Sequence, residues 1–379
     1  MSTGFNYKFL YKLAIFFLAF VLFSCDGKNH NENLSELSAQ SKDSLAVDTV
    51  FALNYPEIKY NLIHIDSKST LNNILNKYND SAELGQYYRK ILRTLNRKEL
   101  RFFRVGQDVI VPDSVLSDIR AYSIFPEYYP GAKNIEKIII ICNSMQAYAC
   151  YEHGCLVRFA AANTGKERTP TFPGRYALVW KQKLRRSSLD STWVMPYTFN
   201  FHQYAGSAMH QFEMPGRPVS HSCVRQFEDD AIWIFSWGVG AKYDTNKQVI
   251  PYTGTPLIIL NTFDFSRKVG GPWLELTSNK SYYVELPEVP MEVEEALIPY
   301  VQIPKSSRGS LPNRERYINA EAILRERGII REGVELIQSV DFNEIRRKRE
   351  KEKIAKLKRE EEMKKRADTI NSTIQNTNQ

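Results

Sequence analysis

The stretch SAMHQFEMPGRPVSHSCVR, residues 207–225, decides how this sequence is interpreted. It holds two histidines, one cysteine and two arginines, although the whole chain of 379 residues has only six histidines. A free thiol with a pKa of about 8.5 is a poor nucleophile, and a neighbouring imidazole lowers that pKa to about 4–7. The stretch therefore predicts that Cys223 is a nucleophile with a histidine close to it.

The two histidines of this stretch relate differently to Cys223. His221 is two residues away, so on an extended strand both side chains point to the same face. His210 is thirteen residues away and reaches the thiol only if a strand and a loop fold back on themselves. Both residues are candidate bases. The structural alternative is that Cys223 is a small apolar side chain buried in a core.

Around this stretch, residues 135–262 are rich in strand patterns. The runs are 138–141, 146–151, 156–162, 175–180 and 257–260, with the turn Glu152-His153-Gly154 between the second and the third. Residues 228–237 begin with acids and continue with apolar residues at helical spacing, which predicts one short helix. We expect a mainly β catalytic domain, a β-sandwich with one short helix.

Within this segment the chain resembles the L,D-transpeptidase (YkuD-type) catalytic domain. Ser220-His221-Ser222-Cys223-Val224-Arg225 is similar to the SHGCxR signature of that family, and Ala208-Met209-His210 stands where the family has an upstream histidine. Four further fragments follow the family's order: the hairpin at 151–154, the turn at 169–176, Met195-Pro196-Tyr197 and Asp230-Ala231.

The resemblance implies a peptidoglycan L,D-transpeptidase that needs no cofactor and no metal. Cys223 is then the nucleophile that attacks the bond between the diamino acid of a stem peptide and its terminal D-alanine. His210 is the implied base, and Ser220 and His221 orient the loop or the base. The implied oxyanion and substrate-binding residues are Ser222, Arg225, Arg217 and Tyr197.

Two positions depart from the family pattern. Ser222 stands where the family has glycine, and so does Gln211, which follows His210. If position 222 requires a positive φ, a serine there costs about 1 kcal/mol. Two alternatives to transpeptidation therefore stay open. The acyl-enzyme is released to water, as in an L,D-carboxypeptidase or a wall–protein amidase, or the chain is a non-catalytic wall-binding lipoprotein.

The N-terminus predicts a lipid-anchored protein of the cell envelope. Residues 13–23 form an apolar run that follows Lys8 and Lys12, and the run is too short to cross a bilayer as an ordinary helix. Cys25 comes directly after it, so residues 1–25 resemble a bacterial lipoprotein signal in which this cysteine receives the lipid. An ordinary secretory signal or a short anchor is the alternative. We expect the mature protein to face the periplasm and to be held to a membrane by its lipid.

The rest of the chain divides into four segments. Residues 26–55 are polar and predict a linker. Residues 56–114 predict a small α+β module with a faint resemblance to the glycan-binding LysM module, so glycan strands join stem peptides as expected ligands. Residues 263–312 are a proline-containing extension, and residues 313–379 are a charged helical tail.

The charge of the chain is concentrated at one end. The net charge is +8, and much of the excess lies in the last forty residues, where Lys, Arg and Glu alternate. Such a tail is typical of a solvated helix, so we expect a protein partner or an anionic polymer there. No nucleic-acid-binding motif accompanies the charge, and nucleic acid is not an expected ligand.

Overall fold

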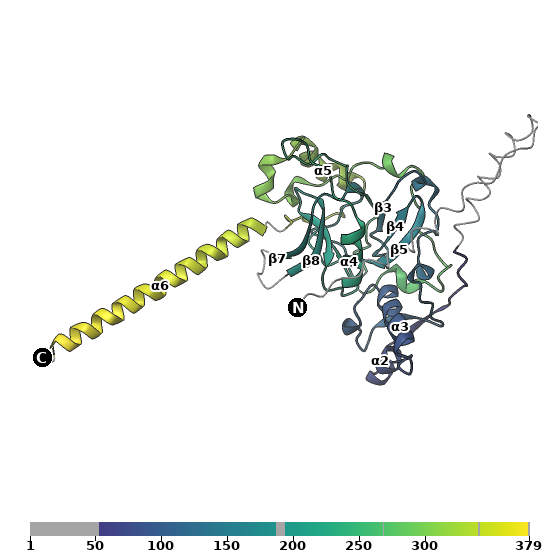
Figure 1. Ribbon diagram of the computed structural model, residues 1–379, viewed down its shortest axis with the longest axis horizontal. Helices are drawn as coiled ribbons and strands as arrows, with labels where there is room; N and C mark the ends of the chain where they lie inside the picture. Colours follow the sequence, from purple (N-terminus) through teal and green to yellow (C-terminus); the bar gives the residue numbers. More distant parts are fainter. Residues whose placement is uncertain (1–52, 187–193, 268, 340–341, 378–379) are drawn as a thin grey trace, which may run out of the picture. The chain divides into compact units, whose positions relative to one another are not determined.

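The computed structural model describes residues 53–186, 194–267, 269–339 and 342–377 (Figure 1). The predicted lipoprotein signal with Cys25, and all but the last residues of the predicted linker, lie outside the described residues. The central region consists mostly of β-sheet with few helices, as the sequence predicts.

One sheet has five strands in the order β5-β4-β3-β11-β6. These strands are β3 (Ile138–Cys142), β4 (Ala147–Glu152), β5 (Cys155–Ala161), β6 (Gly174–Ala177) and β11 (Pro256–Leu260). Strand β3 is buried on both faces, which explains its continuous run of isoleucines. It pairs antiparallel with β4 and parallel with β11, so the chain between β3 and β11 must cross over to the same end of the sheet.

The turn between β4 and β5 has the predicted left-handed backbone. His153 has φ +47° and Gly154 has φ +81°, and positive φ at both central residues is the requirement of a type I′ hairpin turn. Figure 1 shows β3, β4 and β5 side by side, in agreement with their pairing. The prediction of a hairpin here is confirmed.

The second sheet has four strands in the order β10-β9-β8-β7. They are β7 (Lys181–Arg186), β8 (Val194–His202), β9 (Ser207–Gln211) and β10 (Val224–Gln226). Buried side chains of both sheets, among them Ile139, Leu257, Phe199 and Met209, belong to one hydrophobic core. The stretch that carries the candidate site therefore supplies two neighbouring strands of this sheet and the loop between them.

The helix α4 (Glu228–Trp237) has the bounds that the sequence predicts. Three acids in its first turn are favourable at the positive end of the helix dipole. The helix contacts β8 and β9 and buries Ala231 and Ile234. It therefore covers one face of the four-stranded sheet, and it leaves the other face to the candidate site.

Residues 58–112 form a small α+β unit. Strands β1 (Tyr60–His64) and β2 (Asp108–Pro112) pair antiparallel, and between them lie α2 (Lys68–Leu75) and α3 (Ala82–Leu95). The unit is tied to the strand-rich region, since Arg93 of α3 lies 2.6 Å from Asp229 of α4. The backbone N–H of Glu99 also donates to Met214 O at 2.9 Å, just before the loop that carries Cys223.

Residues beyond β11 are mostly irregular before they become helical. Short 3-10 turns lie there at η5 (Pro272–Glu275), η6 (Pro290–Glu292), η7 (Tyr300–Gln302) and η8 (Lys305–Ser310), and others lie before β3 at η2 (Leu100–Phe102), η3 (Ile119–Tyr122) and η4 (Pro130–Ala132). The helices α5 (Arg314–Glu326) and α6 (Phe342–Thr377) follow, and Gly328, with φ +67°, lies just after the end of α5. Over the described residues, every helix is too short or too polar to cross a membrane.

Candidate active site

Strands β9 and β10 bring the candidate residues together. They pair in parallel with Arg225 opposite His210 and Val224 opposite Met209. Val224 and Met209 are fully buried in the core, so the alternation of side chains directs His210 and Arg225 to the other face of the sheet. Cys223 comes two residues before Arg225 and directly before β10, so the same alternation directs its side chain to that face.

The hydrogen bond of His210 fixes which ring nitrogen is free. Nδ1 lies 2.9 Å from the carbonyl oxygen of Gln211. A carbonyl only accepts, so Nδ1 carries the proton and the neutral ring keeps its lone pair on Nε2. Burial, assisted by the charges of Arg225 and Arg185, lowers the pKa of His210 to about 4. At neutral pH this imidazole is therefore an uncharged base with Nε2 free to accept a proton.

The Cys223 thiol is partly buried and protonated at rest. Burial raises its pKa, while the Ala208 N–H and the charges of Arg225 and Arg185 act in the opposite direction. Sγ lies 3.9 Å from the carbonyl oxygen of Gly206. Among the hydrogen bonds of the described residues, none joins Sγ to a ring nitrogen. The expected thiolate with a lowered pKa is thus not the resting state, because desolvation outweighs the neighbouring charges.

His221 is engaged elsewhere. Its Nε2 lies 3.1 Å from Lys166 Nζ, and because an ammonium only donates, the lone pair of Nε2 is already used. Burial, Lys166 and Arg225 lower the pKa of His221 to about 4. The Ser220 hydroxyl donates to the carbonyl oxygen of Cys223. Of the two candidate bases, the geometry therefore favours His210, and it gives Ser220 and His221 contacts that shape the loop.

The turn Thr169-Pro170-Thr171 holds this loop from behind. The hydroxyls of Thr169 and Thr171 donate to the carbonyl oxygens of Ser220 and Ser222, both at 3.1 Å. In a trans peptide the C=O and the following N–H point in opposite directions. With the Ser222 carbonyl held by Thr171, the Cys223 N–H faces away from the turn, as an oxyanion donor must.

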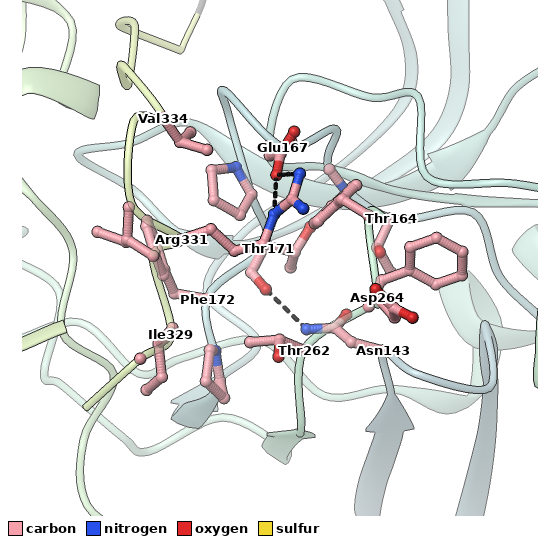
Figure 2. A pocket seen from close by; sticks show the side chains of 17 residues that line it. Asn143, Thr164, Glu167, Thr171, Phe172, Thr262, Asp264, Ile329, Arg331 and Val334 are labelled. Atoms are coloured by element: carbon pink, nitrogen blue, oxygen red, sulfur yellow. Dashed lines mark hydrogen bonds and ion pairs between the residues drawn. The ribbon is translucent and has the colours of Figure 1, made fainter. Parts of the chain in front are cut away.

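These two threonines are functional candidates that the sequence analysis missed. The family resemblance covers the turn at 169–176 but implies no role for its hydroxyls. The available signal was their spacing, since residues two apart on an extended segment point the same way and meet every second carbonyl. Figure 2 shows that Thr171 is itself held, because Asn143 Nδ2 donates to its carbonyl oxygen at 2.8 Å.

Ser222 has φ +79°, so the position does require the conformation that glycine adopts freely. The serine is almost fully buried, and its hydroxyl lies 2.8 Å from the hydroxyl of Ser207, which is also buried. The pair gives both buried hydroxyls a partner. The departure from the family glycine is thus accommodated by a second serine in β9.

We expect Ser207→Ala to lower the free energy of unfolding by about 1–3 kcal/mol, because it leaves the Ser222 hydroxyl buried without this partner. The double variant Ser207→Ala/Ser222→Gly should regain most of that loss, since it removes both hydroxyls and relieves about 1 kcal/mol of backbone strain. Urea unfolding of the three proteins measures this. A double variant no more stable than Ser207→Ala would contradict it.

The two remaining candidates lie in different surroundings. Arg217 is exposed, and its backbone N–H lies 3.4 Å from Asn163 Oδ1. The Tyr197 ring packs on Phe235 of α4 at 5.8 Å, and Phe199 contacts the same ring. Tyr197 therefore lies on the face of β8 that α4 covers, opposite to the face of Cys223.

Within the described ranges, no group of three His, Cys, Asp or Glu side chains is arranged to hold a metal ion.

Residues 136–259 match a known protein family, YkuD, described as the L,D-transpeptidase catalytic domain. No curated protein matches the sequence.

Among solved structures, the chain is similar to an L,D-transpeptidase from Xylanimonas cellulosilytica, with 19% identity, a TM-score of 0.32, and coverage of 54% of this chain and 99% of that chain. It is also similar to L,D-transpeptidase 1 from Mycobacterium tuberculosis, with 20% identity, a TM-score of 0.25, and coverage of 33% of this chain and 62% of that chain. Four of the similar structures are matched over only 57–62% of their own length. The part of the chain that carries Cys223 and His210 thus has the sequence pattern of an L,D-transpeptidase (YkuD) catalytic domain.

Proposed function

We propose that this protein is a peptidoglycan L,D-transpeptidase that works through a thioester on Cys223. The observation that carries the proposal is the hydrogen bond from His210 Nδ1 to Gln211, which leaves Nε2 as a neutral base on the face of the sheet where Cys223 lies. The family match of residues 136–259 supplies the substrate class, the stem peptides of the wall.

The chemistry follows from these positions. His210 Nε2 takes the thiol proton as sulfur attacks the carbonyl carbon of the diamino acid. The backbone N–H groups of Ser222 and Cys223 stabilise the oxyanion, an effect worth about 3–4 kcal/mol in other enzymes. The C–N bond then breaks, and the proton on Nε2 passes to the leaving amine of D-alanine. An acceptor amine gives its proton to Nε2, attacks the thioester and releases the Cys223 thiol.

The charge of Arg225 assists the same steps. Its guanidinium packs over the Phe212 ring at 4.6 Å and donates to Glu213 O at 3.0 Å, which holds it at the edge of the site. Its positive charge lowers the pKa of the Cys223 thiol, and this favours the sulfur anion as it forms. Arg225 therefore stabilises the nucleophile in addition to any contact with a stem carboxylate.

The proposed setting is the cell envelope. A lipid on Cys25 would hold the domain at a membrane surface facing the periplasm, where stem peptides occur. The α+β unit at residues 58–112 and the helix α6 are then candidates for contacts with glycan strands and with a protein partner.

The first test combines trapping with turnover. A carbapenem should form a covalent adduct on Cys223, seen by mass spectrometry, and a tetrapeptide stem with an amine acceptor should give both free D-alanine and a cross-linked product. Release of D-alanine without a cross-link would establish the hydrolase alternative. A folded protein that forms no adduct and releases no D-alanine would leave a wall-binding role.

A further inference from the structure

A pocket of about 300 Å³ lies beside the catalytic loop. Its wall comes from three segments: residues 166–168, residues 217–218 of the loop that leads to Cys223, and Phe263, Phe265, Arg267 and Gly270 of the chain after β11. The last segment follows the part that matches the transpeptidase family, so this chain adds its own side of the pocket. Phe263 and Phe265 form the apolar part of that side.

The pocket has an excess of positive charge. Its charged lining residues are Lys166, Arg168, Arg217, Arg267 and one acid, Glu167. Glu167 is paired with Arg331 at 2.5 Å, as Figure 2 shows, and Arg267 is paired with Glu275 at 2.5 Å.

The other three cations of the pocket have no such partner. Lys166, Arg168 and Arg217 form no ion pair with any carboxylate in the part of the chain that the structure describes. Cations gathered in a pocket whose one lining carboxylate is paired elsewhere raise each other's energy and favour an anion from outside the chain.

The pKa of Lys166 also reflects the excess of positive charge in the pocket. Burial and then the like charges of Arg168 and Arg225 lower the pKa of Lys166. Lys166 in turn lies 3.1 Å from the ring of His221, which is two residues from Cys223. The positive field of the pocket therefore extends to the loop that carries the nucleophile.

We propose that this pocket binds the free terminal carboxylate of the peptide that Cys223 attacks. The assignment rests on the proposed function, since it names the part of the substrate that the site recognises. One extended residue spans about 3.5 Å, so the carboxylate of the leaving residue lies one residue from the attacked carbonyl. Lys166, in the wall of the pocket, lies 3.1 Å from His221, which is two residues before Cys223. A planar guanidinium such as that of Arg217 suits a carboxylate because it pairs with both oxygens. The pocket then makes the enzyme selective for removing a terminal residue.

The test is a binding measurement that needs no turnover. Full-length protein with Cys223→Ala is titrated calorimetrically with a tetrapeptide stem and with the same peptide as its C-terminal carboxamide. The free acid should bind about ten-fold or more tightly than the carboxamide, as charge-assisted hydrogen bonds to a carboxylate require. Adding Arg217→Gln should reduce this preference to about two-fold or less. The matched control is Arg327→Gln, another exposed arginine that lies outside the pocket, and it should keep the full preference.

Two results would overturn the assignment. One is equal binding, or no binding, of the acid and the carboxamide; the other is a preference that Arg217→Gln and Arg168→Gln leave unchanged. The proposed function fails separately. If the unsubstituted chain releases no D-alanine while binding still depends on the carboxylate, the pocket assignment stands and the transpeptidase proposal falls.

Discussion

Cys223→Ala is expected to lower the release of D-alanine from a tetrapeptide stem by about 10⁴-fold or more, because the acyl-enzyme route needs the sulfur atom. The fold should persist. The thiol makes only weak contacts, with the Gly206 carbonyl and the Ala208 N–H, and its small volume is largely replaced by a methyl group. The measurement pairs D-alanine release with the midpoint of thermal unfolding.

Cys155→Ala is the matched control for this prediction. Cys155 is the other partly exposed free cysteine among the described residues, and it lies at the start of β5 in the hairpin, in a different sheet from Cys223. It should keep full activity. If Cys223→Ala retained turnover, or if Cys155→Ala lost it, the nucleophile would have been assigned to the wrong sulfur.

The elements that the sequence predicted well are those set by local physics. The hairpin at residues 152–155 follows from a glycine where the backbone is left-handed, and α4 follows from acids at its start and apolar spacing after them. The isoleucine run of β3 shows a strand buried on both faces. In each case the signal and the structure that it specifies lie within about ten residues of each other.

The roles within the site depend on contacts that sequence spacing does not show. His221 and Lys166 are 55 residues apart in the sequence. Their hydrogen bond occupies the lone pair of His221 Nε2, so His221 is not available as the base. The buried hydroxyl of Ser222 finds its partner in Ser207, fifteen residues earlier in β9. Tyr197 belongs to a fragment that fits the family pattern, yet its ring packs on α4. Such long-range contacts exist only once the sheets have formed.

Segments outside the family match also contact the site, and no sequence pattern indicates these contacts. The α+β unit meets the loop before Cys223 through the bond between Glu99 and Met214. The segment after α5 contacts the turn between β8 and β9, where the Ser339 hydroxyl donates to Ala205 O at 2.7 Å, next to the Gly206 carbonyl that the thiol contacts. Parts of the chain outside the family match therefore contact both the loop before Cys223 and the turn beside its thiol.

His210→Gln is expected to lower kcat/KM for the tetrapeptide by about 10³-fold, the usual contribution of a general base, whereas His221→Gln should lower it by about ten-fold or less. The two variants are matched, since each replaces a largely buried imidazole whose pKa lies near 4. The difference comes from the free Nε2 of His210, because the Nε2 of His221 already accepts from Lys166. If His221→Gln lost more activity than His210→Gln, His221 and not His210 would be the general base.

The pH dependence gives an independent check of the same base. Protonation of Nε2 removes the lone pair that takes the thiol proton, so activity falls as the pH drops through the pKa of His210. Burial lowers that pKa to about 4, which moves the fall well below the value of about 6.5 for an ordinary histidine. Between pH 7 and about 5, kcat/KM should therefore show no loss from this group. An acid limb centred near 6.5 would mean that His210 is solvated during turnover, and that the desolvated ring of the resting structure is not the base that acts.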